Sequence, residues 1–362
     1  MSVKPRKALA EVRPYIPGKP IEELKRELGI KGEIQKLASN ENPIGPSPKA
    51  IEAIKKELGK TNIYPDNECF YLKKGLMKHL DVGRENLIVG NGSVELIMLT
   101  AMAYLSPEDE FIAGNRSFAL AKISVKLMGA KFKGIPERDY THNLDAIKDA
   151  ITDNTKIIYI DNPANPLGTK IPKEKIGNFI CSVPDNIIII LDEAYYEFVE
   201  KDQLPDSIKF VKQGKNVLVL RTFAKMYGLA GLRIGYGIAS PEIIQTVGKA
   251  RLPFNVNRFA QAAALAALDD EEHIRRTLKV NKEGKEYLTN AFEEMGISYI
   301  PSSTNFITFK IGKDAQKVFM ELQKGGIIIR PLANYGMAEF LRVTIGRSEQ
   351  NKLLVETLKK IV

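Results

Sequence analysis

The sequence predicts an α/β protein with a large, mostly parallel seven-stranded sheet and a smaller α+β unit. Short aliphatic runs alternate with helix-patterned stretches from about residue 85, which is typical of βα units. These runs are apolar on both faces, and the pattern changes to two strands, a helix, two strands and a helix after residue 269. A length of 362 residues also favours two domains.

Seven aliphatic runs are the candidate strands of the large sheet. The first two are followed by helix-patterned segments at 94–104 and 120–128. Because the runs carry apolar side chains on both faces, helices should cover both sides of the sheet. The candidate strands are 87–90, 110–113, 131–135, 156–161, 187–193, 217–222 and 233–239.

The C-terminal part of the chain predicts a separate α+β unit. A helix at 257–268 leads to a charged opening at 269–272 and then to a long amphipathic segment that reaches Met295. We expect the proline-rich first 45 residues to pack on this unit, because they are too irregular to fold alone. The predicted domains are therefore a large one at 46–268 and a small one made of 1–45 and 269–362. The elements expected after Met295 are strands at 298–300 and 305–310, a helix at 314–324, strands at 327–330 and 340–344, and a closing helix.

The composition is that of an ordinary globular chain, and it argues against several functions. The formal net charge is +9, but pairs of Lys lie near Glu on helix-like segments, so an anionic small molecule is preferred to nucleic acid as a partner. The two cysteines stand alone and the three histidines are expected to be solvated, so no metal site is expected. No aliphatic stretch approaches the length of a membrane span, and we expect a cytoplasmic protein.

Two polar positions follow buried strands, where ligands bind in open parallel sheets. Asn91, Gly92 and Ser93 lie between a strand and an apolar helix, a geometry that suits a phosphate, although Ser93 is also a good helix cap. Asp192 ends the aliphatic run that begins at Ile187. In isolation, Asp192 is equally consistent with a functional acid and with a cap after the strand.

Lys225 leaves the end of another buried strand and is followed by a glycine-rich loop. A lysine at the mouth of a sheet is lightly solvated, so it can lose its proton and form a Schiff base. Arg233 follows eight positions later and begins the next expected strand. Taken alone, a lysine in such a position is more often a surface residue.

Together these segments resemble the fold type I pyridoxal-phosphate enzymes, aminotransferase class I/II, and among them the histidinol-phosphate aminotransferases. The resemblance covers nearly the whole chain, and the order and spacing of its motifs are specific. The motifs are Tyr15-Ile16-Pro17-Gly18, Ser39-Asn40-Glu41-Asn42-Pro43, Tyr64-Pro65-Asp66, Gly90-Asn91-Gly92-Ser93, residues 162–168, the Asp192 and Lys225 segments, and residues 341–346.

The resemblance implies pyridoxal 5'-phosphate as the cofactor and gives each residue near it a role. Lys225 resembles the lysine that binds the cofactor aldehyde and later moves a proton between substrate and cofactor. Asp192 resembles the acid that keeps the pyridine nitrogen protonated, which makes the ring an electron sink. Tyr195 and Asn165 resemble the donors to the ring 3-oxygen. Phe118 resembles the aromatic residue that stacks on the ring, although a core position suits it as well.

The cofactor phosphate is expected at Gly92, Ser93 and Arg233, with Tyr64 reaching across from a second subunit. The resemblance therefore implies a homodimer. In most members of the family the residue before the lysine is a serine that also binds this phosphate, whereas here it is Ala224. One phosphate ligand is therefore missing, which predicts weaker cofactor binding.

The substrate is expected to be an anion. Arg342 resembles the arginine that fixes the substrate anion, and Arg330, Tyr15 and Asn165 are expected beside it. The resemblance implies amino transfer from L-glutamate to imidazole acetol phosphate, giving L-histidinol phosphate and 2-oxoglutarate. This reaction belongs to histidine biosynthesis.

Several alternatives stay open at the level of sequence. The nearest is an aromatic amino-acid aminotransferase, because the same architecture accepts phenylalanine-type side chains. A decarboxylase acting on a phosphorylated amino acid is a second. A nicotinamide oxidoreductase, suggested by the partial glycine pattern at 90–92, and a basic nucleic-acid-binding protein are minor alternatives.

Overall fold

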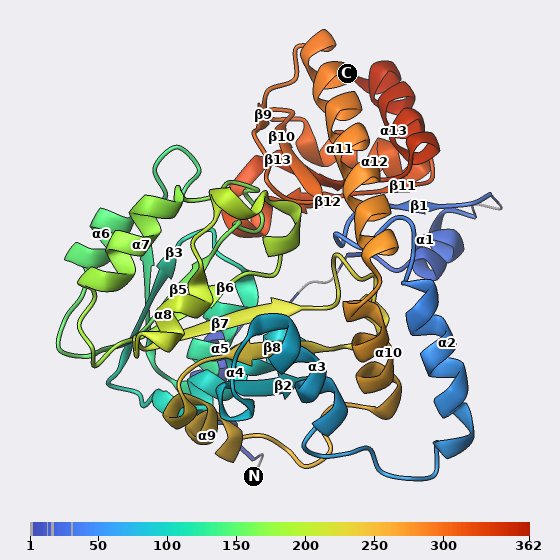
Figure 1. Cartoon of the computed structure of the whole chain (residues 1–362). Coiled ribbons are helices and arrows are strands. Elements are labelled where there is room, and N and C mark those ends of the chain that lie inside the picture. Colours follow the sequence, from blue (N-terminus) through green and yellow to red (C-terminus); the bar gives the residue numbers. More distant parts are fainter. Residues whose placement is uncertain (1–2, 13, 16–17, 30–31) are drawn as a thin grey trace.

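Seven strands form one sheet in the larger part of the molecule (Figure 1). The computed structural model describes residues 3–12, 14–15, 18–29 and 32–362, so Ile16 and Pro17 of the first motif lie outside the described residues. The strand order is β2-β8-β7-β6-β5-β3-β4; β8 is antiparallel to both neighbours, and the other pairs are parallel. The expected seven-stranded, mostly parallel sheet is confirmed. Its strands are β2 (Leu87–Gly90), β3 (Glu110–Gly114), β4 (Lys131–Ile135), β5 (Thr155–Asp161), β6 (Ile188–Asp192), β7 (Val217–Thr222) and β8 (Gly235–Ile238).

Helices cover both faces of this sheet. Its central strands β6 and β7 are therefore buried along their whole length. The side chains of the sheet accordingly divide between two apolar cores, one on each face. The smaller core packs against α4 (Ser93–Tyr104), α5 (Ala119–Met128) and α9 (Pro241–Lys249). The larger core packs against α3 (Phe70–Leu80), α6 (Leu144–Asp149), α7 (Lys173–Ser182), α8 (Ser207–Lys212) and α10 (Arg258–Leu268).

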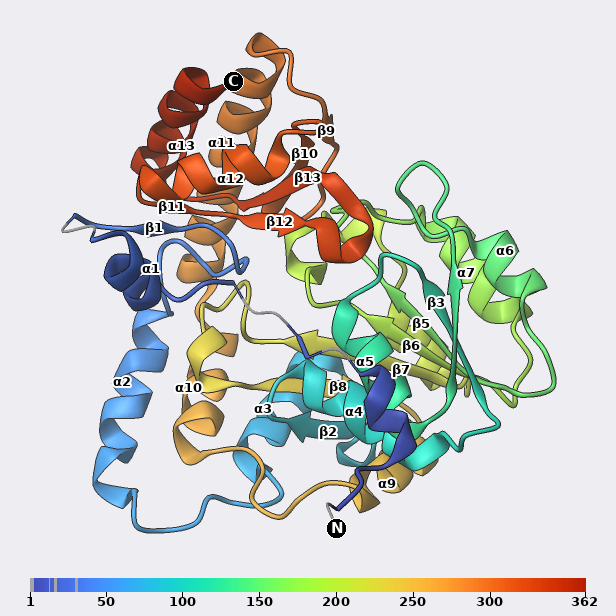
Figure 2. The same cartoon turned by 180° about the vertical axis from the view of Figure 1, so that it is seen from behind.

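A second, smaller unit lies against the large sheet and contains the C-terminus (Figures 1 and 2). Its four-stranded antiparallel sheet has the order β12-β13-β10-β9, and a third apolar core lies between this sheet and three helices. The strands are β9 (Tyr299–Ile300), β10 (Phe306–Lys310), β12 (Arg330–Leu332) and β13 (Met337–Thr344), and the helices are α11 (Glu271–Glu294), α12 (Ala315–Lys324) and α13 (Ser348–Ile361).

The prediction of one strand at 327–330 is wrong. The structure divides it into β11 (Ile327–Ile328), which pairs in parallel with β1 (Gln35–Lys36), and β12, in which Arg330 pairs with Arg342 of β13. One aliphatic run thus serves two sheets. The partners that divide it lie far away in the sequence, so no local pattern could show the break.

The N-terminal segment packs on the smaller unit only in part. Leu24, Ile34 and Leu37 lie against that unit, whereas the 3-10 helix at Lys7–Glu11 packs on α5 of the larger unit, so the expectation is wrong for that stretch. The backbone N–H of Thr344 donates to the carbonyl of Leu37 at 2.8 Å, and Leu24 and Ile34 share a small core with Ile328. One helix belongs to this part of the chain, α1 (Ile21–Leu28); α2 (Pro48–Glu57) follows it and packs against α10 of the larger unit. The exact domain boundaries, at 45/46 and 268/269, stay a prediction.

The long helix α11 connects the two units, beginning directly after α10 (Figure 1). Its N-terminus is capped by Asp270, whose carboxylate accepts the backbone N–H of His273. In the part of the chain that the structure describes, neither α11 nor any other helix is long and apolar enough to cross a membrane. Short 3-10 helices lie at Lys7–Glu11, Leu58–Lys60, Arg84–Asn86, Tyr196–Phe198, Lys201–Gln203, Ala230–Leu232 and Ala333–Tyr335.

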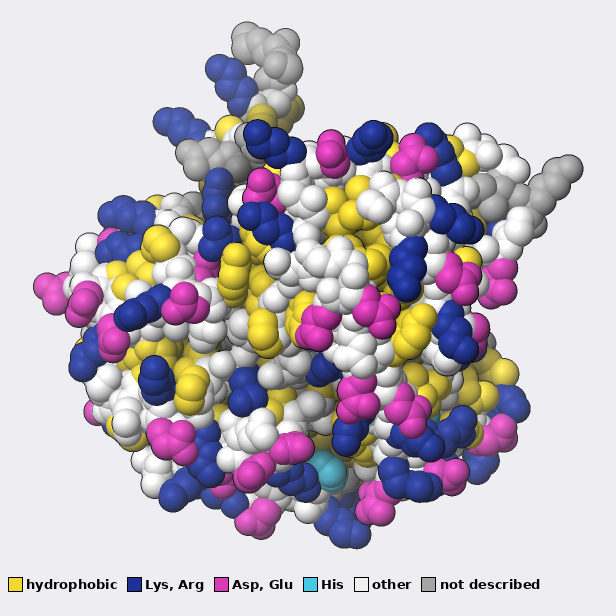
Figure 3. Space-filling view, turned by 90° about the horizontal axis from the view of Figure 1, so that it is seen from above, with side chains coloured by type: hydrophobic (Ala, Val, Ile, Leu, Met, Phe, Trp, Pro, Cys, Tyr) yellow, Lys and Arg dark blue, Asp and Glu magenta, His cyan; other side chains and the backbone are white. Residues whose placement is uncertain are grey.

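The charges on the visible surface are mixed. Figure 3 shows Lys and Arg side chains interspersed with Asp and Glu over the face seen from above, rather than gathered into one field. Many of the surface charges form ion pairs, such as Lys55 with Glu52 and Lys60 with Glu57. On this face, positive and negative side chains therefore alternate, as solvated helix faces do.

Candidate active site

One pocket lies between the large sheet and the smaller unit. The last residues of three neighbouring parallel strands line it: Asp161 of β5, Asp192 of β6 and Thr222 of β7. The smaller unit contributes Arg330 and Arg342. The pocket has a volume of about 1040 Å³, including space open to solvent. It therefore lies where open parallel sheets bind ligands, at the carboxyl ends of the strands.

Lys225 lies three residues beyond β7 and reaches into this pocket. Its Nζ donates to the carbonyl of Ser39 at 3.2 Å and lies 5.8 Å from the centre of the Tyr195 ring. Burial, and then the positive charge of Arg342, lower the pKa of Lys225 to about 8. An amine with this pKa is neutral in about a tenth of molecules at pH 7, far more than an ordinary lysine, so it can act as a nucleophile or as a base.

Asp192 is buried at the end of β6, with only 4% of its surface exposed. Its carboxylate accepts the hydroxyl proton of Tyr159 at 2.7 Å and the backbone N–H of Ala194 at 3.1 Å. Burial raises the pKa of Asp192 to about 7, against the hydrogen bond from Tyr159, which lowers it. A positively charged group in the pocket would favour the ionised carboxylate, so Asp192 is suited to hold a cation.

Tyr195 and Asn165 line the same pocket as Arg342 of β13. The buried hydroxyl of Tyr195 accepts a hydrogen bond from the side chain of Asn40 at 2.8 Å. The side-chain oxygen of half-buried Asn165 accepts a hydrogen bond from Arg342. Phe118 caps α5 and lines the same pocket with a half-buried ring. The three side chains expected around a cofactor ring therefore share one pocket.

A second region of the pocket is shaped by glycines and presents hydrogen-bond donors. Gly92 has φ +86°, and a Cβ there would lie 2.6 Å from the guanidinium of Arg233. A Cβ at Gly235 would lie 2.5 Å from the backbone nitrogen of Ser93. Ser93 and Arg233 line the pocket, whereas Gly92 lies behind them, outside the lining. Ser93 is the first residue of α4, so this cradle combines a guanidinium with the positive end of a helix.

Arg330 and Arg342 are cross-strand partners on the smaller sheet and are each 6% exposed. The guanidinium of Arg342 donates to Asn165 and to the carbonyl of Ala38, and its Nε is buried with no hydrogen-bond partner. The guanidinium of Arg330 lies 5.5 Å from the centre of the Tyr15 ring, which is 39% exposed. Two buried cations side by side make this end of the pocket a receptor for an anion.

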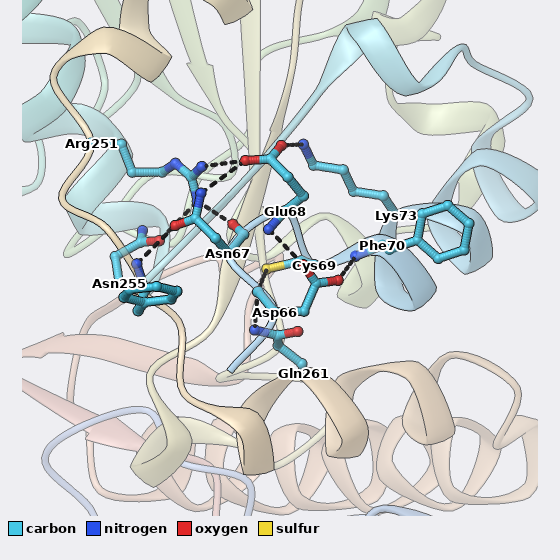
Figure 4. A network of polar contacts seen from close by, with 10 residues as sticks. Asp66, Asn67, Glu68, Cys69, Phe70, Lys73, Arg251, Asn255 and Gln261 are labelled. Carbon is cyan, nitrogen blue, oxygen red and sulfur yellow. Dashed lines mark hydrogen bonds and ion pairs between the residues drawn. The ribbon is translucent and has the colours of Figure 1, made fainter. Parts of the chain in front are cut away.

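Tyr64 does not line the pocket of its own chain. Its side chain is 76% exposed and stacks on Phe254 with 4.6 Å between ring centres. Figure 4 shows the polar network that fixes the adjoining segment. Arg251 donates to the carbonyl of Asn67 at 2.6 Å and to the carboxylate of Glu68 at 2.9 Å. The network therefore ties the segment after Tyr64 to the chain that follows α9.

Several pocket residues escaped the analysis of the sequence. Asp161 and Thr222 end β5 and β7 as Asp192 ends β6, so the strand-end rule could have found both. Tyr159 lies two residues before the end of β5, so the same rule indicates it less directly. Tyr335 carries no local signal, because a loop of the smaller unit brings it to the pocket.

The expectation that all three histidines are solvated is wrong for two of them. His142 and His273 are 7% and 3% exposed, and only His79 lies at the surface. Both buried rings contact polar partners: Asp161 faces His142, and Asn42 faces His273. Among the described residues, no group of three or more His, Cys, Asp or Glu side chains is arranged to hold a metal ion.

This fold and this pocket define an aminotransferase: a strand-end lysine, a buried strand-end acid and a pair of arginines meet between a large and a small unit. The sequence profile of the family described as aminotransferase class I and II matches residues 33–358. The chain belongs to this family.

Within the family, the chain is similar to histidinol-phosphate aminotransferases. That of Moorella thermoacetica is 44% identical over 360 residues, which cover 99% of this chain and 93% of the relative. That of Akkermansia muciniphila is 47% identical over 354 residues, covering 97% of each chain. The crystal structure of histidinol-phosphate aminotransferase from Sinorhizobium meliloti in complex with pyridoxal-5'-phosphate is 27% identical, with a TM-score of 0.91, and the match covers 100% of this chain and 99% of that one.

Proposed function

We propose that this aminotransferase uses pyridoxal 5'-phosphate to exchange an amino group between L-glutamate and imidazole acetol phosphate, giving L-histidinol phosphate and 2-oxoglutarate. The observation that carries the proposal is the pair of buried arginines, Arg330 and Arg342, in the same pocket as Lys225 and Asp192. The names of the relatives described above support the same reaction.

The residues present fit this cofactor. The absence of a Cβ at Gly92 and Gly235 lets Arg233 and the backbone of Ser93 pack closely at the cradle, which offers donors to a phosphate. Asp192 would hold the ring nitrogen, and Tyr195 with Asn165 would hold the ring oxygen. Lys225 is the amine available to the aldehyde.

When bound, the cofactor supplies an electron sink for the negative charge that develops as the amino acid loses its α-hydrogen. Asp192 supports this by keeping a proton on the ring nitrogen, because a buried carboxylate favours an adjacent cation. The amine of Lys225 would accept the α-proton of the amino acid and pass it to the cofactor. The Tyr195 hydroxyl accepts from Asn40, which leaves its own proton to donate into the pocket.

The two arginines account for the choice of substrate. Arg342 is the shared anchor, because its guanidinium is fixed by Asn165 and by the carbonyl of Ala38. Arg330 adds a second positive charge beside Arg342, which suits a phosphate group that carries two negative charges, whereas glutamate carries its two charges on separate carboxylates. Tyr15 lies beside Arg330 and closes this side of the pocket.

The deciding experiment compares kcat/KM for histidinol phosphate, glutamate and phenylalanine in the wild-type protein, Arg342→Lys and Arg330→Ala. We expect Arg342→Lys to damage every half-reaction, because an ammonium cannot replace the two-pronged guanidinium. Arg330→Ala should cost the histidinol-phosphate reaction about 10-fold or more and the glutamate reaction less. A wild-type preference for phenylalanine over histidinol phosphate would instead indicate an aromatic amino-acid aminotransferase.

We also propose that the chain forms a homodimer in which Tyr64 completes the partner's phosphate site. Tyr64 is held on its own chain by a stacked Phe254 and is exposed rather than turned into its own pocket. Other exposed apolar side chains lie on the same stretches of sequence, near Tyr64 or near Phe254 along the chain. They are Ile63, Phe70, Tyr71 and Leu252. Sedimentation of the purified protein tests the dimer, and Tyr64→Ala should weaken cofactor binding.

A further inference from the structure

A buried aspartate in the wall of the pocket is paired with a buried histidine outside the pocket lining. His142 precedes α6 and Asp161 ends β5, and their side chains are 2% and 4% exposed. The Nε2 of His142 lies 2.9 Å from one carboxylate oxygen of Asp161 and 3.2 Å from its backbone carbonyl. With two acceptors facing it, Nε2 must carry a proton and donate.

The second carboxylate oxygen of Asp161 contacts Asn165, another residue of the pocket wall. It accepts the backbone N–H of Asn165 at 2.8 Å. The side chain of Asn165 accepts a hydrogen bond from Arg342. Asp161 therefore holds the backbone of Asn165, and the side chain of Asn165 contacts the arginine that would anchor the substrate.

Asp161 also lies next to the acid of the pocket. Asp161 and Asp192 are register partners at the ends of adjacent parallel strands, so two carboxylates face the same edge of the sheet. The charge of Asp161 contributes to the raised pKa of Asp192, after burial. A positive charge on His142 would offset the charge of Asp161 and limit this repulsion.

The groups on the other side of His142 favour that positive charge. A Cβ built on Gly114 would lie 2.7 Å from His142 Nδ1 and 2.8 Å from a carboxylate oxygen of Glu137, so both atoms border the same small space. Glu137 is itself paired with Arg116 at 2.9 Å. Burial lowers the pKa of His142, but the hydrogen bond and the charge of Asp161, with that of Glu137, outweigh it and raise the pKa overall.

We propose that His142 and Asp161 form a positioning pair: the imidazole fixes the Asp161 carboxylate, which fixes Asn165 and, through Asn165, the orientation of Arg342. His142 does not line the pocket, whereas Asp161 lines it beside Asn165. Their effect is to set the geometry of the anchor and the charge beside Asp192. The kinetic part of this proposal rests on the proposed function, whereas the state of the pair in the cofactor-free protein does not.

The first test uses nuclear magnetic resonance of the ring nitrogens in cofactor-free protein, which has only three histidines. The His79→Asn and His273→Asn variants assign the signals without altering the pair. In the wild type we expect the Nε2 of His142 to carry a proton at neutral pH, because both acceptors of Asp161 face it. In Asp161→Asn, the amide can donate to Nε2, so the ring proton should move to Nδ1. A wild-type His142 without a proton on Nε2, or a state that Asp161→Asn leaves unchanged, would overturn the pair.

The second test measures kcat and KM separately for glutamate in Asp161→Asn, His142→Gln, Asn165→Ala and the double variant Asp161→Asn/Asn165→Ala. We expect each single variant of the pair to raise KM about 10-fold, the size typical of a group that orients a ligand-binding residue, with kcat changed much less. In the Asn165→Ala background, Asp161→Asn should add little, because its route to Arg342 is already lost.

Two kinetic outcomes would contradict the proposal. One is an Asp161→Asn effect of the same size with and without the Asn165 side chain, which would show that Asp161 does not act through Asn165. The other is a loss confined to kcat. Failure of the protein to react with histidinol phosphate would contradict the proposed function alone, since both tests of the pair use the free protein or glutamate.

Discussion

Lys225 is distinguished from the other lysines of the chain by its place at the mouth of the sheet, where burial and Arg342 lower its pKa to about 8. Below that pH the amine is mostly protonated and cannot attack an aldehyde. The rate at which cofactor-free protein captures pyridoxal phosphate should therefore rise about tenfold per unit between about pH 6 and pH 8, and then level off. Stopped-flow absorbance measures this rate.

The control for this prediction is Lys225→Ala, which should remain folded but show no covalent capture and no transamination. A flat rate across the same pH range would mean that the lysine is neutral throughout or that another step limits capture. Normal turnover in Lys225→Ala would remove Lys225 from its proposed role.

Burial of Asp192 lowers the stability of the folded protein at neutral pH, and the proposed function requires this burial. Its pKa of about 7 lies above the ordinary value of 3.8, so its contribution to folding becomes less favourable as pH rises from about 4 to 7, where the folded protein must carry a buried charge. Asp192→Asn should therefore stabilise the cofactor-free protein more at pH 8 than at pH 5, as measured by urea unfolding.

Asp192→Asn should also slow the single-turnover reaction with glutamate severely, because an amide cannot keep the ring nitrogen protonated. An unchanged rate would make Asp192 only a strand-end cap.

Ala224 lies in the wall of the pocket beside Lys225 and is 7% exposed. Its backbone N–H donates to the hydroxyl of Thr222 at 3.1 Å, so Thr222 is the hydroxyl that the structure places nearby. Ala224→Ser should tighten cofactor binding by about 1 kcal/mol or somewhat more, the size of one added hydrogen bond to a charged group. Equilibrium dialysis measures it, with Thr222→Val as the comparison. No gain from the serine, together with a loss in Thr222→Val, would show that Thr222 already fills this role.

Among the elements, the ends of β5, β6 and β7 deliver Asp161, Asp192 and Thr222 to one edge. The start of α4 lies beside the same edge and adds the donors of the phosphate cradle. Parallel strands make this arrangement possible because all their carboxyl ends meet on one side of the sheet. The chemistry is therefore concentrated in residues that directly follow buried strands.

The segment after Tyr64 is an element without regular structure, held by Arg251 (Figure 4). Arg251→Ala removes hydrogen bonds to Asn67, Glu68 and Asn255 and should destabilise this segment by about 2 kcal/mol. Amide hydrogen exchange should become faster at residues 66–70, and cofactor affinity should fall with it.

The matched control is Lys249→Ala, an exposed cation two residues earlier. If both variants exchange alike, Arg251 does not hold the segment. Faster exchange with unchanged cofactor affinity would separate the segment from the cofactor site.

At the scale of the whole molecule, two packed units form one pocket, and the proposed dimer adds a residue from a second chain. Mixed dimers of Lys225→Ala and Tyr64→Ala test this directly. If Tyr64 acts on the partner's site, one of the two sites in each mixed dimer has both wild-type residues. We expect about half of the wild-type activity per mixed dimer, measured at low cofactor concentration, with each parent dimer well below that level. A mixed dimer no more active than its parents would place Tyr64 on its own chain's site or outside both.

The sequence by itself determined the large sheet and the order of its elements. Seven short runs predicted seven strands, because a central strand buried on both faces must be apolar throughout, and that pattern is local; the edge strand β4, with Lys131 and Lys133, is less apolar. The sequence also indicated Asp192 and Lys225 as candidates, since Asp192 ends one such run and Lys225 lies three residues beyond another. Most of the detailed site came from resemblance to a family, because neither residue has a role that its neighbours alone define.

Tertiary structure decided what depends on distant partners. Ile327 and Arg330 belong to different sheets because Gln35 and Arg342 pair with them, and no pattern within the run reveals those partners. His142 lies in a polar, loop-like sequence that predicts exposure, yet it is buried. Asp161, at the end of β5, faces it, and their hydrogen bonds offset the cost of burying the imidazole. Local sequence encodes the period and the polarity of an element, whereas burial of a polar group depends on which partner the fold brings within hydrogen-bonding distance.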